Sequence, residues 1–369
     1  MSSDRGLIEH NCVISARNRI FDAFHPRKAY LQSLYAAADR CLYKEVPRPL
    51  KPLKTRQDLP EERASAKKPD WFRIRLQEGD RFQKIDQLVK THKLATVCSE
   101  ARCPNIYECW NQGTATFMLM GDTCTRACKF CHVKGGRPGA LDHDEPQKIA
   151  ESVATLELSY IVLTSVNRDD LLDEGSQHFA DTVRAIKKLS SNILVETLTP
   201  DFRRTQVDSI ARMIDAGVDV LAHNVETIRR LVPHVRDARC DHDVSLGFHR
   251  YAKSLKQDLI TKSSIMLGLG ETREEVLECM QELKEAGVDV VTLGQYLQPT
   301  KFHHPVIRYV HPDEFKEFEL KGKEMGFRFV ASGPLVRSSY RAAEVFMEGE
   351  LRQSKSASQD GEGVSHEHF

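Results

Sequence analysis

The chain lacks an excess of charge of either sign, because its 369 residues include 53 Lys and Arg and 53 Asp and Glu. A protein that binds nucleic acid mainly through the phosphates needs a basic excess, so we predict no nucleic-acid partner. Long hydrophobic runs are also missing: no apolar stretch approaches the roughly 18 residues of a membrane span, and the amino terminus has no apolar signal-peptide core. We therefore expect neither a membrane partner nor export.

The two ends of the chain differ in composition from its middle. Residues 1–69 hold 14 Lys and Arg against 8 Asp and Glu, and the stretch from Pro47 to Lys68 is rich in proline and charge. We predict an amino-terminal arm and linker over 1–69, partly disordered, and a disordered polar tail over 350–369. The arm has too many acidic residues for a mitochondrial presequence, so we expect a cytoplasmic protein. A mitochondrial or plastid matrix is the alternative, if the arm is a transit peptide.

Short runs rich in β-forming residues alternate with helical patterns in the middle of the chain. The runs are Thr114–Met120, Tyr160–Thr164, Ile193–Thr197, Val218–Ala222, Ser263–Leu267, Val288–Leu293 and Phe327–Ala331. One helix is predicted over Ser176–Leu189, and another over Arg273–Ala286 with Thr272 as its N-cap. Apolar strands alternating with helices indicate a parallel sheet covered by helices. The choice lies between an open doubly wound sheet and a full or partial (β/α) barrel.

Polar residues follow several of these strands at the point where each ends. Thr164–Asn167 follow the second strand, Glu196 ends the third, and His223 with Asn224 follows the fourth. Chemistry in either fold is expected at the carboxyl ends of the strands, although each of these residues can equally serve as a cap or turn. The charged turn at 168–170 is either functional or a solvated loop, and we assign it no role.

Cysteine has the most informative distribution of any residue type. Six of the ten cysteines fall between Cys98 and Cys131, a clustering that indicates metal ligation rather than a disulfide framework. Cys124, Cys128 and Cys131 form a C-x3-C-x2-C loop just after the first predicted strand. Three thiolates on one loop suit an iron–sulfur cluster or zinc, and zinc would need a fourth ligand from His132 or a distant cysteine.

A second group of thiols precedes this loop. It is a C-x4-C-x5-C run that predicts a second cluster, with structural zinc as the alternative, and consists of Cys98, Cys103 and Cys109. The remaining cysteines have no partner at a metal-binding spacing, and we expect ordinary thiols at Cys12, Cys41, Cys240 and Cys279. The adjacent His303 and His304 look like a metal pair, but neighbouring histidines more often point apart, so we do not expect ligation.

The first loop, with Phe130 before its last cysteine, resembles the signature of the radical S-adenosylmethionine superfamily. The strings CSEARCPNIYECW, VLTSVNRDDL, ILVETLTPDFR, SSIMLGLGET and LGQYLQPT, and the RSSY motif at Arg337–Tyr340, are similar to those of the lipoyl synthase family. The resemblance covers about residues 70–349, although His132 and the long arm differ from many relatives. It implies a partial (β/α) TIM-type barrel of about six parallel strands over 114–349, preceded by an auxiliary-cluster extension over 70–113.

The resemblance also implies two 4Fe–4S clusters. The first would bind S-adenosylmethionine through an open iron, and its ligands would be Cys124, Cys128 and Cys131. The second would donate sulfur, and its ligands would be Cys98, Cys103, Cys109 and Ser339. A serine alkoxide is a harder ligand than a thiolate, so its bond suits a cluster that comes apart, and this makes Ser339 a catalytic residue. From the residues alone, Ser338 and Ser339 would instead cap a helix at Tyr340–Phe346.

By the same resemblance, three residues would contact S-adenosylmethionine. Phe130 would lie near the adenine, Glu196 near the ribose hydroxyls and Asn224 near another polar group. Phe130 can equally be a packed core residue, and the two polar residues can equally support the contacts of others.

The activity implied is that of a sulfurtransferase, which inserts two sulfur atoms at C6 and C8 of a protein-bound N6-octanoyl-lysine to give the lipoyl cofactor. The methylenes attacked have no acidic hydrogen at neutral pH, so a radical derived from S-adenosylmethionine is required. One alkyl chain must then reach both cysteine groups. Alternatives are another two-cluster sulfur-inserting enzyme of the biotin synthase type, or a non-enzymatic iron–sulfur or zinc protein.

The implied partners follow from this chemistry. They are octanoylated lipoyl-carrier domains of the 2-oxoacid dehydrogenase E2 or glycine-cleavage H protein type, an electron donor such as ferredoxin or flavodoxin, and an iron–sulfur carrier that rebuilds the consumed cluster.

Overall fold

The structure is a computed structural model that describes residues 68–339 and Gly349, apart from 73–78, 93, 102, 104, 112–115, 157 and 159. All of these residues belong to one compact unit, Leu59–Phe369. The predicted arm up to residue 67, the predicted tail and the helix expected at Tyr340–Phe346 lie outside the described residues, as do Cys12 and Cys41. None of the described helices is long and apolar enough to cross a membrane.

The core is an eight-stranded sheet in the order β1-β2-β5-β6-β7-β8-β9-β10. Its strands are β1 Ala95–Thr96, β2 Thr116–Leu119, β5 Tyr160–Ser165, β6 Leu194–Leu198, β7 Val220–Ala222, β8 Ile260–Leu267, β9 Val290–Gln295 and β10 Phe329–Gly333. β1 runs antiparallel to β2, and every other neighbouring pair is parallel. β1 and β10 stand at the two edges, so the sheet is not closed. The predicted partial (β/α) barrel is confirmed, with seven parallel strands where about six were expected.

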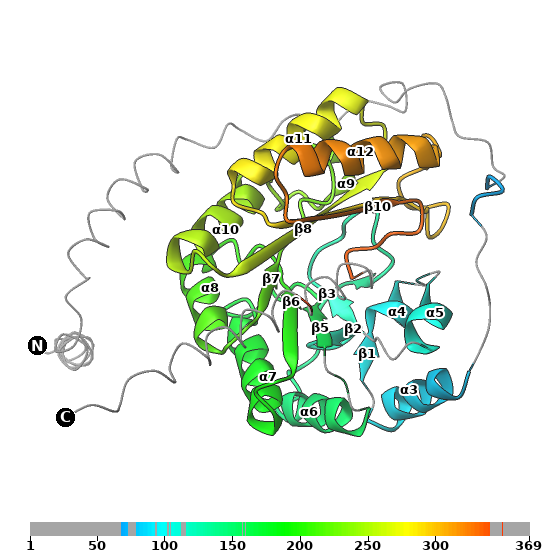
Figure 1. The fold of residues 1–369 in the computed structure, drawn as a ribbon. Helices are drawn as coiled ribbons and strands as arrows, with labels where there is room; N and C mark the ends of the chain where they lie inside the picture. The colour runs from blue at the N-terminus through cyan, green and yellow to red at the C-terminus, as the bar shows by residue number, and fades with distance from the viewer. Residues whose placement is uncertain are drawn as a thin grey trace, which may run out of the picture. The chain divides into compact units, whose positions relative to one another are not determined.

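Helices connect the parallel strands and cover the outer side of the sheet (Figure 1). They are α6 Glu145–Thr155, α7 Ser176–Leu189, α8 Gln206–Asp215, α10 His242–Leu255, α11 Arg273–Glu285 and α12 Pro312–Glu324. α7 has the predicted bounds. α11 begins with the predicted cap, in which the Thr272 hydroxyl accepts from Glu275 N and the Glu275 carboxylate accepts from Thr272 N. This reciprocal cap satisfies amide groups that helix geometry leaves without partners.

Shorter elements attach the second cysteine group, Cys98 to Cys109, to the edge of the sheet. They are α3 Asp80–Thr91, α4 Val97–Glu100 and α5 Ile106–Asn111, with the strand pair β3 Thr123–Cys124 and β4 Lys134–Gly135 further on. α3 packs on α5 through Phe82, whose ring centroid lies 5.0 Å from that of Trp110. β1, between α3 and α4, pairs with β2, so the segment with Cys98 and Cys109 is fixed beside the first parallel strand.

A buried charged pair lies within the sheet. Lys262, in β8, is 1% exposed, and its Nζ lies 2.8 Å from Oε1 of Glu196 in β6. The hydroxyl of Tyr160, in β5, donates to Oε2 of the same carboxylate at 2.6 Å. The predicted strand began at Ser263 because lysine is rarely a core residue, whereas the observed strand begins at Ile260.

Two buried histidines lie between β7 and α10. His223 Nδ1 is 2.9 Å from Thr199 O, and its Nε2 is 3.0 Å from Ser245 Oγ. His249 Nε2 is 2.8 Å from His223 O. Burial lowers the pKa of His223 to about 4 and that of His249 to about 3. Both rings are therefore neutral in the folded chain at the pH, about 6.5, where histidine in an unfolded chain titrates.

Removing Lys262 while keeping Glu196 should destabilise the fold, because a buried carboxylate without its partner is costly. We predict that Lys262→Met lowers the free energy of unfolding by about 3–5 kcal/mol, measured by urea denaturation at neutral pH. The double variant Lys262→Met with Glu196→Gln should recover much of that loss. The exposed pair Lys323 and Glu319 is the control, and breaking it should cost at most about 1 kcal/mol. Equal losses at the two places would contradict the buried pair.

The free energy of unfolding should also fall as the pH drops below about 6.5, because the unfolded chain binds protons that the two folded histidines do not. Well below that pH and down to about 4, each of His223 and His249 should contribute about 1.4 kcal/mol per pH unit to the slope. Urea denaturation at closely spaced pH values measures this slope, and His249→Phe should remove the contribution of one ring. A slope that this substitution leaves unchanged would show that other groups produce it.

Candidate functional site

The first cysteine loop, Cys124–Cys131, lies at the carboxyl ends of the parallel strands. β3 and β4 pair at its base. Its backbone is bonded to the segment after β5, where Thr125 N donates to Asn167 O at 3.0 Å. It is also bonded to the segment after β7, where Lys129 N donates to Val235 O at 2.8 Å. The loop thus occupies the end of the sheet where the sequence pattern predicts chemistry.

Arg126 holds this loop from the inside. It is 4% exposed, and its guanidinium donates to Asp169, after β5, and to Asp201, after β6, at 2.8 Å each. Burial raises the pKa of both carboxyls, but the hydrogen bonds from Arg126 outweigh it, so both pKa values are lowered. The charged turn after β5 is therefore not a solvated loop, since Arg168 is also buried and pairs with Asp170 at 2.8 Å.

Backbone N–H groups point at two of the sulfurs in this loop. Cys124 Sγ accepts from Asn167 N at 3.2 Å, and Cys128 Sγ accepts from Asp237 N at 3.3 Å. Burial raises the pKa of Cys131 to about 11, so its thiol stays protonated at neutral pH unless a metal displaces the proton. N–H groups directed at sulfur stabilise the thiolates that a metal centre needs and tune the potential of an iron–sulfur cluster.

A fourth thiol lies beside the first loop. Cys240 forms a side-chain hydrogen bond with Cys128, and Arg126 Nη1 donates to Cys240 Sγ at 3.5 Å. The bond with Cys128 lowers the pKa of Cys240 below its ordinary value. The segment after β7 brings Cys240 to the loop from far along the chain, a contact that its position in the sequence did not predict. Cys279 is buried, as expected of a core thiol.

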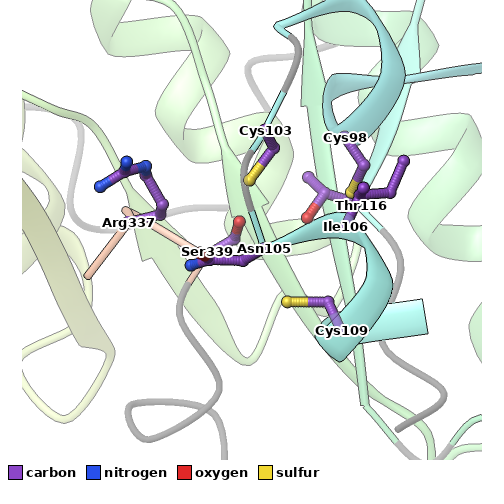
Figure 2. Close-up of a pocket in the computed structure, with 8 residues that line it drawn as sticks. All are labelled: Cys98, Cys103, Asn105, Ile106, Cys109, Thr116, Arg337 and Ser339. Atoms are coloured by element: carbon purple, nitrogen blue, oxygen red, sulfur yellow. The ribbon is translucent and has the colours of Figure 1, made fainter. Parts of the chain in front are cut away.

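The second group of cysteines lines a pocket beside the β1 edge of the sheet. Cys98 lies in α4, Cys109 in α5 and Cys103 between them. Figure 2 shows these three residues in one small pocket, which is partly open to solvent and is also lined by Ser339 and Arg337. Burial raises the pKa of Cys98 to about 11, so this residue too is a thiol in the absence of metal.

Ser339 reaches this pocket because its segment is held at two places. Asn105 Nδ2 donates to Leu335 O at 2.7 Å, which ties the cysteine segment to the residues after β10. Gly294, in β9, allows the same residues to lie against the strand, since a Cβ on this glycine would be 2.1 Å from Val336 O. The structure therefore places Ser339 in one pocket with the three cysteines.

Arg337 also lines the pocket, a role that the sequence reasoning did not consider. Burial lowers the pKa of its guanidinium, while the electrostatic interaction with the neighbouring Cys103 acts in the opposite direction. A cation here favours deprotonated thiols and offsets the negative charge of a bound metal–thiolate centre. The RSSY motif contained this signal, because Arg337 is its first residue.

A compact group of possible metal ligands lies away from both cysteine trios. Zinc holds sulfur ligands at about 2.3 Å, which places them about 3.8 Å from one another in a tetrahedron. Across the described ranges, one group of three possible ligand atoms lies within 4.8 Å of one another, at His242, Cys279 and Glu282. Neither cysteine trio belongs to such a group among the described residues. His303 and His304 do not belong to that group either.

The residues predicted to contact S-adenosylmethionine are engaged in contacts within the protein. Phe130 is half-buried and packs against the core around β8 and β9. Both carboxylate oxygens of Glu196 are bound to Lys262 in the sheet interior. Asn224 Nδ2 donates to Glu226 Oε1 at 3.2 Å. These contacts do not test the three cofactor assignments, which stay predictions.

Glu226 is a residue near the first loop that the sequence reasoning missed. Its φ of +67° lies in the left-handed region, which is uncommon for residues other than glycine. Burial raises its pKa, and its charge in turn contributes to the raised pKa of Cys131. A strained, ionisable residue beside the third cysteine is a candidate contact for a ligand of this loop.

Comparisons with known proteins agree with the site. Residues 118–283, from within β2 to within α11, match the Radical SAM superfamily. The chain is 52% identical to the lipoyl synthase of Thermus thermophilus over 286 residues, which cover 77% of this chain and 88% of that protein. It is 53% identical to the lipoyl synthase of Deinococcus radiodurans over 283 residues, 76% of this chain and 85% of that protein. It is also 53% identical to the lipoyl synthase of Anaeromyxobacter dehalogenans over 289 residues, 78% of this chain and 97% of that protein.

Proposed function

The chain belongs to the lipoyl synthase family of radical S-adenosylmethionine enzymes, and from this premise we propose how its own residues serve the reaction. The enzyme is a sulfurtransferase that inserts two sulfur atoms, at C6 and C8, into a protein-bound N6-octanoyl-lysine. An octanoylated lipoyl-carrier domain is therefore its substrate. An enzyme of the biotin synthase type and a non-enzymatic metal protein are not favoured, because the relatives match about three quarters of the chain.

We propose two 4Fe–4S clusters, one at each group of cysteines. The first would be held by Cys124, Cys128 and Cys131, which leaves one iron open to S-adenosylmethionine. The second would be held by Cys98, Cys103, Cys109 and Ser339. When bound, these groups supply a carbon-centred radical that can attack an unactivated methylene, and sulfide for the new bonds. The N–H groups directed at sulfur and the pocket that three cysteines share with Ser339 support the proposal.

The protein's own residues position these groups. Arg126 keeps the first loop on the strand ends through its bonds to Asp169 and Asp201. Asn105 and Gly294 bring Ser339 to the second pocket. An oxygen ligand is a poorer match for a sulfur-rich cluster than a thiolate, and this weaker bond suits a cluster that gives up its sulfur. Two sites attached to one rigid sheet suit two successive reactions of one alkyl chain.

The proposed contacts of S-adenosylmethionine are Phe130 with the adenine, and Asn224, supported by Glu226, with a polar group of the cofactor. A contact of Glu196 with the ribose hydroxyls would require the carboxylate to exchange part of its bonding with Lys262. Glu196 therefore supports the sheet interior in this structure, whatever its further role.

We also propose the partners and the compartment. Cofactor cleavage needs an electron, for which a ferredoxin or flavodoxin is suited, and the lost sulfide must be replaced by an iron–sulfur carrier. The substrate domains would be of the E2 or H protein type. A cytoplasmic location is supported by the need for a reducing compartment, and none of the eight described cysteines forms a disulfide.

Metal analysis tests the proposal directly. Anaerobically purified protein should contain about eight irons per chain, with sulfide to match and little zinc. Replacing Cys98, Cys103 and Cys109 together by alanine should remove about half of the iron, while 5′-deoxyadenosine release persists because the first loop is intact. Cys279→Ala, at a core thiol, is the control and should keep all of the iron. Stoichiometric zinc without sulfide would refute both clusters, and full iron in the triple variant would refute the second.

Ser339→Ala tests the oxygen ligand. We expect the yield of the dithiolane product to fall by about tenfold or more, because a ligand of the sulfur-donating cluster is lost, while 5′-deoxyadenosine release continues. The neighbouring variant Ser338→Ala is the control and should keep the yield. Mass spectrometry of the carrier peptide and chromatography of the nucleoside measure the two products. A normal yield from Ser339→Ala, or equal losses in both variants, would contradict the assignment.

A further inference from the structure

His132 joins the two cysteine groups through its side chain. It follows Cys131 directly, and its Nδ1 lies 3.0 Å from the carbonyl oxygen of Glu100. Glu100 ends α4, between Cys98 and Cys103, where a helix leaves its last carbonyl groups without a partner inside the helix. Because a carbonyl oxygen only accepts, the hydrogen is on Nδ1 of His132. The side chain of His132, the residue directly after the first loop, therefore bonds to the backbone of the second cysteine segment.

A second histidine fixes the position of this ring. The rings of His132 and His303 are stacked, with centroids 5.9 Å apart and an angle of 28° between their planes. His303 comes from the segment after β9 and is held at both nitrogens, with Nε2 3.0 Å from Cys131 O and Nδ1 2.8 Å from Thr300 Oγ1. His132 is therefore positioned from two sides, by packing on His303 and by its bond to Glu100.

The second cysteine segment does not need the His132 bond to stay folded. β1 pairs with β2, Asn105 is bonded to Leu335, and Phe82 of α3 packs on Trp110 of α5. Loss of the bond to Glu100 should leave this segment attached to the sheet but able to shift relative to the first loop. A misplacement of about 1 Å between reacting groups can reduce a rate by about 100-fold.

We propose that His132 is a positioning residue that sets the separation between the Cys98–Cys109 segment and the Cys124–Cys131 loop. The proposal rests on the two-cluster function above, since this separation matters when one alkyl chain must visit both sites. Without the bond, cofactor cleavage at the first loop continues, but the alkyl chain meets the sulfur source in the wrong position. His132 thus couples the two steps and takes part in neither.

Two substitutions separate the hydrogen bond of His132 from its packing. His132→Phe keeps a ring against His303 but has no donor, whereas His132→Asn offers an amide N–H near the position of Nδ1. We expect His132→Phe to cleave about tenfold more S-adenosylmethionine per dithiolane formed and to change the magnetic interaction between the two reduced clusters in electron paramagnetic resonance spectra. His132→Asn should restore both towards the original values. His143→Ala, at an exposed histidine, is the control and should change neither.

Hydrogen exchange of the full chain, with and without iron, gives a readout that does not depend on activity. In His132→Phe the amides of 97–111 should exchange about tenfold faster than in the original chain, and His132→Asn should restore their protection. Unchanged exchange, spectra and cleavage ratio in His132→Phe would overturn the role of His132, as would the failure of His132→Asn to restore them. About four irons in the unsubstituted chain would instead contradict the two-cluster function itself.

Discussion

The burial of Arg126 between Asp169 and Asp201 is the interaction on which the rest of the site depends. A guanidinium that is 4% exposed is stable only with its carboxylates, and these two come from segments that follow different strands. The ion pairs therefore hold the Cys124–Cys131 loop on the carboxyl ends of β5 and β6 at the same time. Because parallel strands end on one edge of a sheet, segments from the other strands can reach the same place.

Contacts between segments that lie far apart in the chain hold the second cysteine group against the sheet. Asn105 binds the residues after β10, and Gly294 leaves the space that those residues need. His132 reaches back from the first loop to Glu100. Each hydrogen bond contributes only about 1 kcal/mol, so the placement of the second pocket depends on several contacts together. Such an arrangement suits an enzyme whose two sites act in turn on one substrate.

Local patterns predicted what depends on residues close in the chain. The bounds of α7 and the cap at Thr272 were correct because periodicity and capping act over a few residues. The close spacing of Cys98, Cys103 and Cys109 in the sequence agrees with the one pocket that they line. The errors concern contacts made only by the fold. β8 was predicted too short because Lys262 is polar in sequence but paired in the core. The contact between Cys240 and Cys128 was not predicted because the two residues are distant in the chain.

The most direct test of the account follows sulfur from the protein into the product. The chain would be reconstituted with a heavy sulfur isotope, freed of loose sulfide and incubated anaerobically with S-adenosylmethionine, a reductant and an octanoylated carrier peptide. The account predicts that mass spectrometry finds both sulfur atoms of the dithiolane heavy, and finds no dithiolane from the chain that lacks Cys98, Cys103 and Cys109. Dithiolane with light sulfur, or heavy dithiolane from the chain without those cysteines, would contradict it.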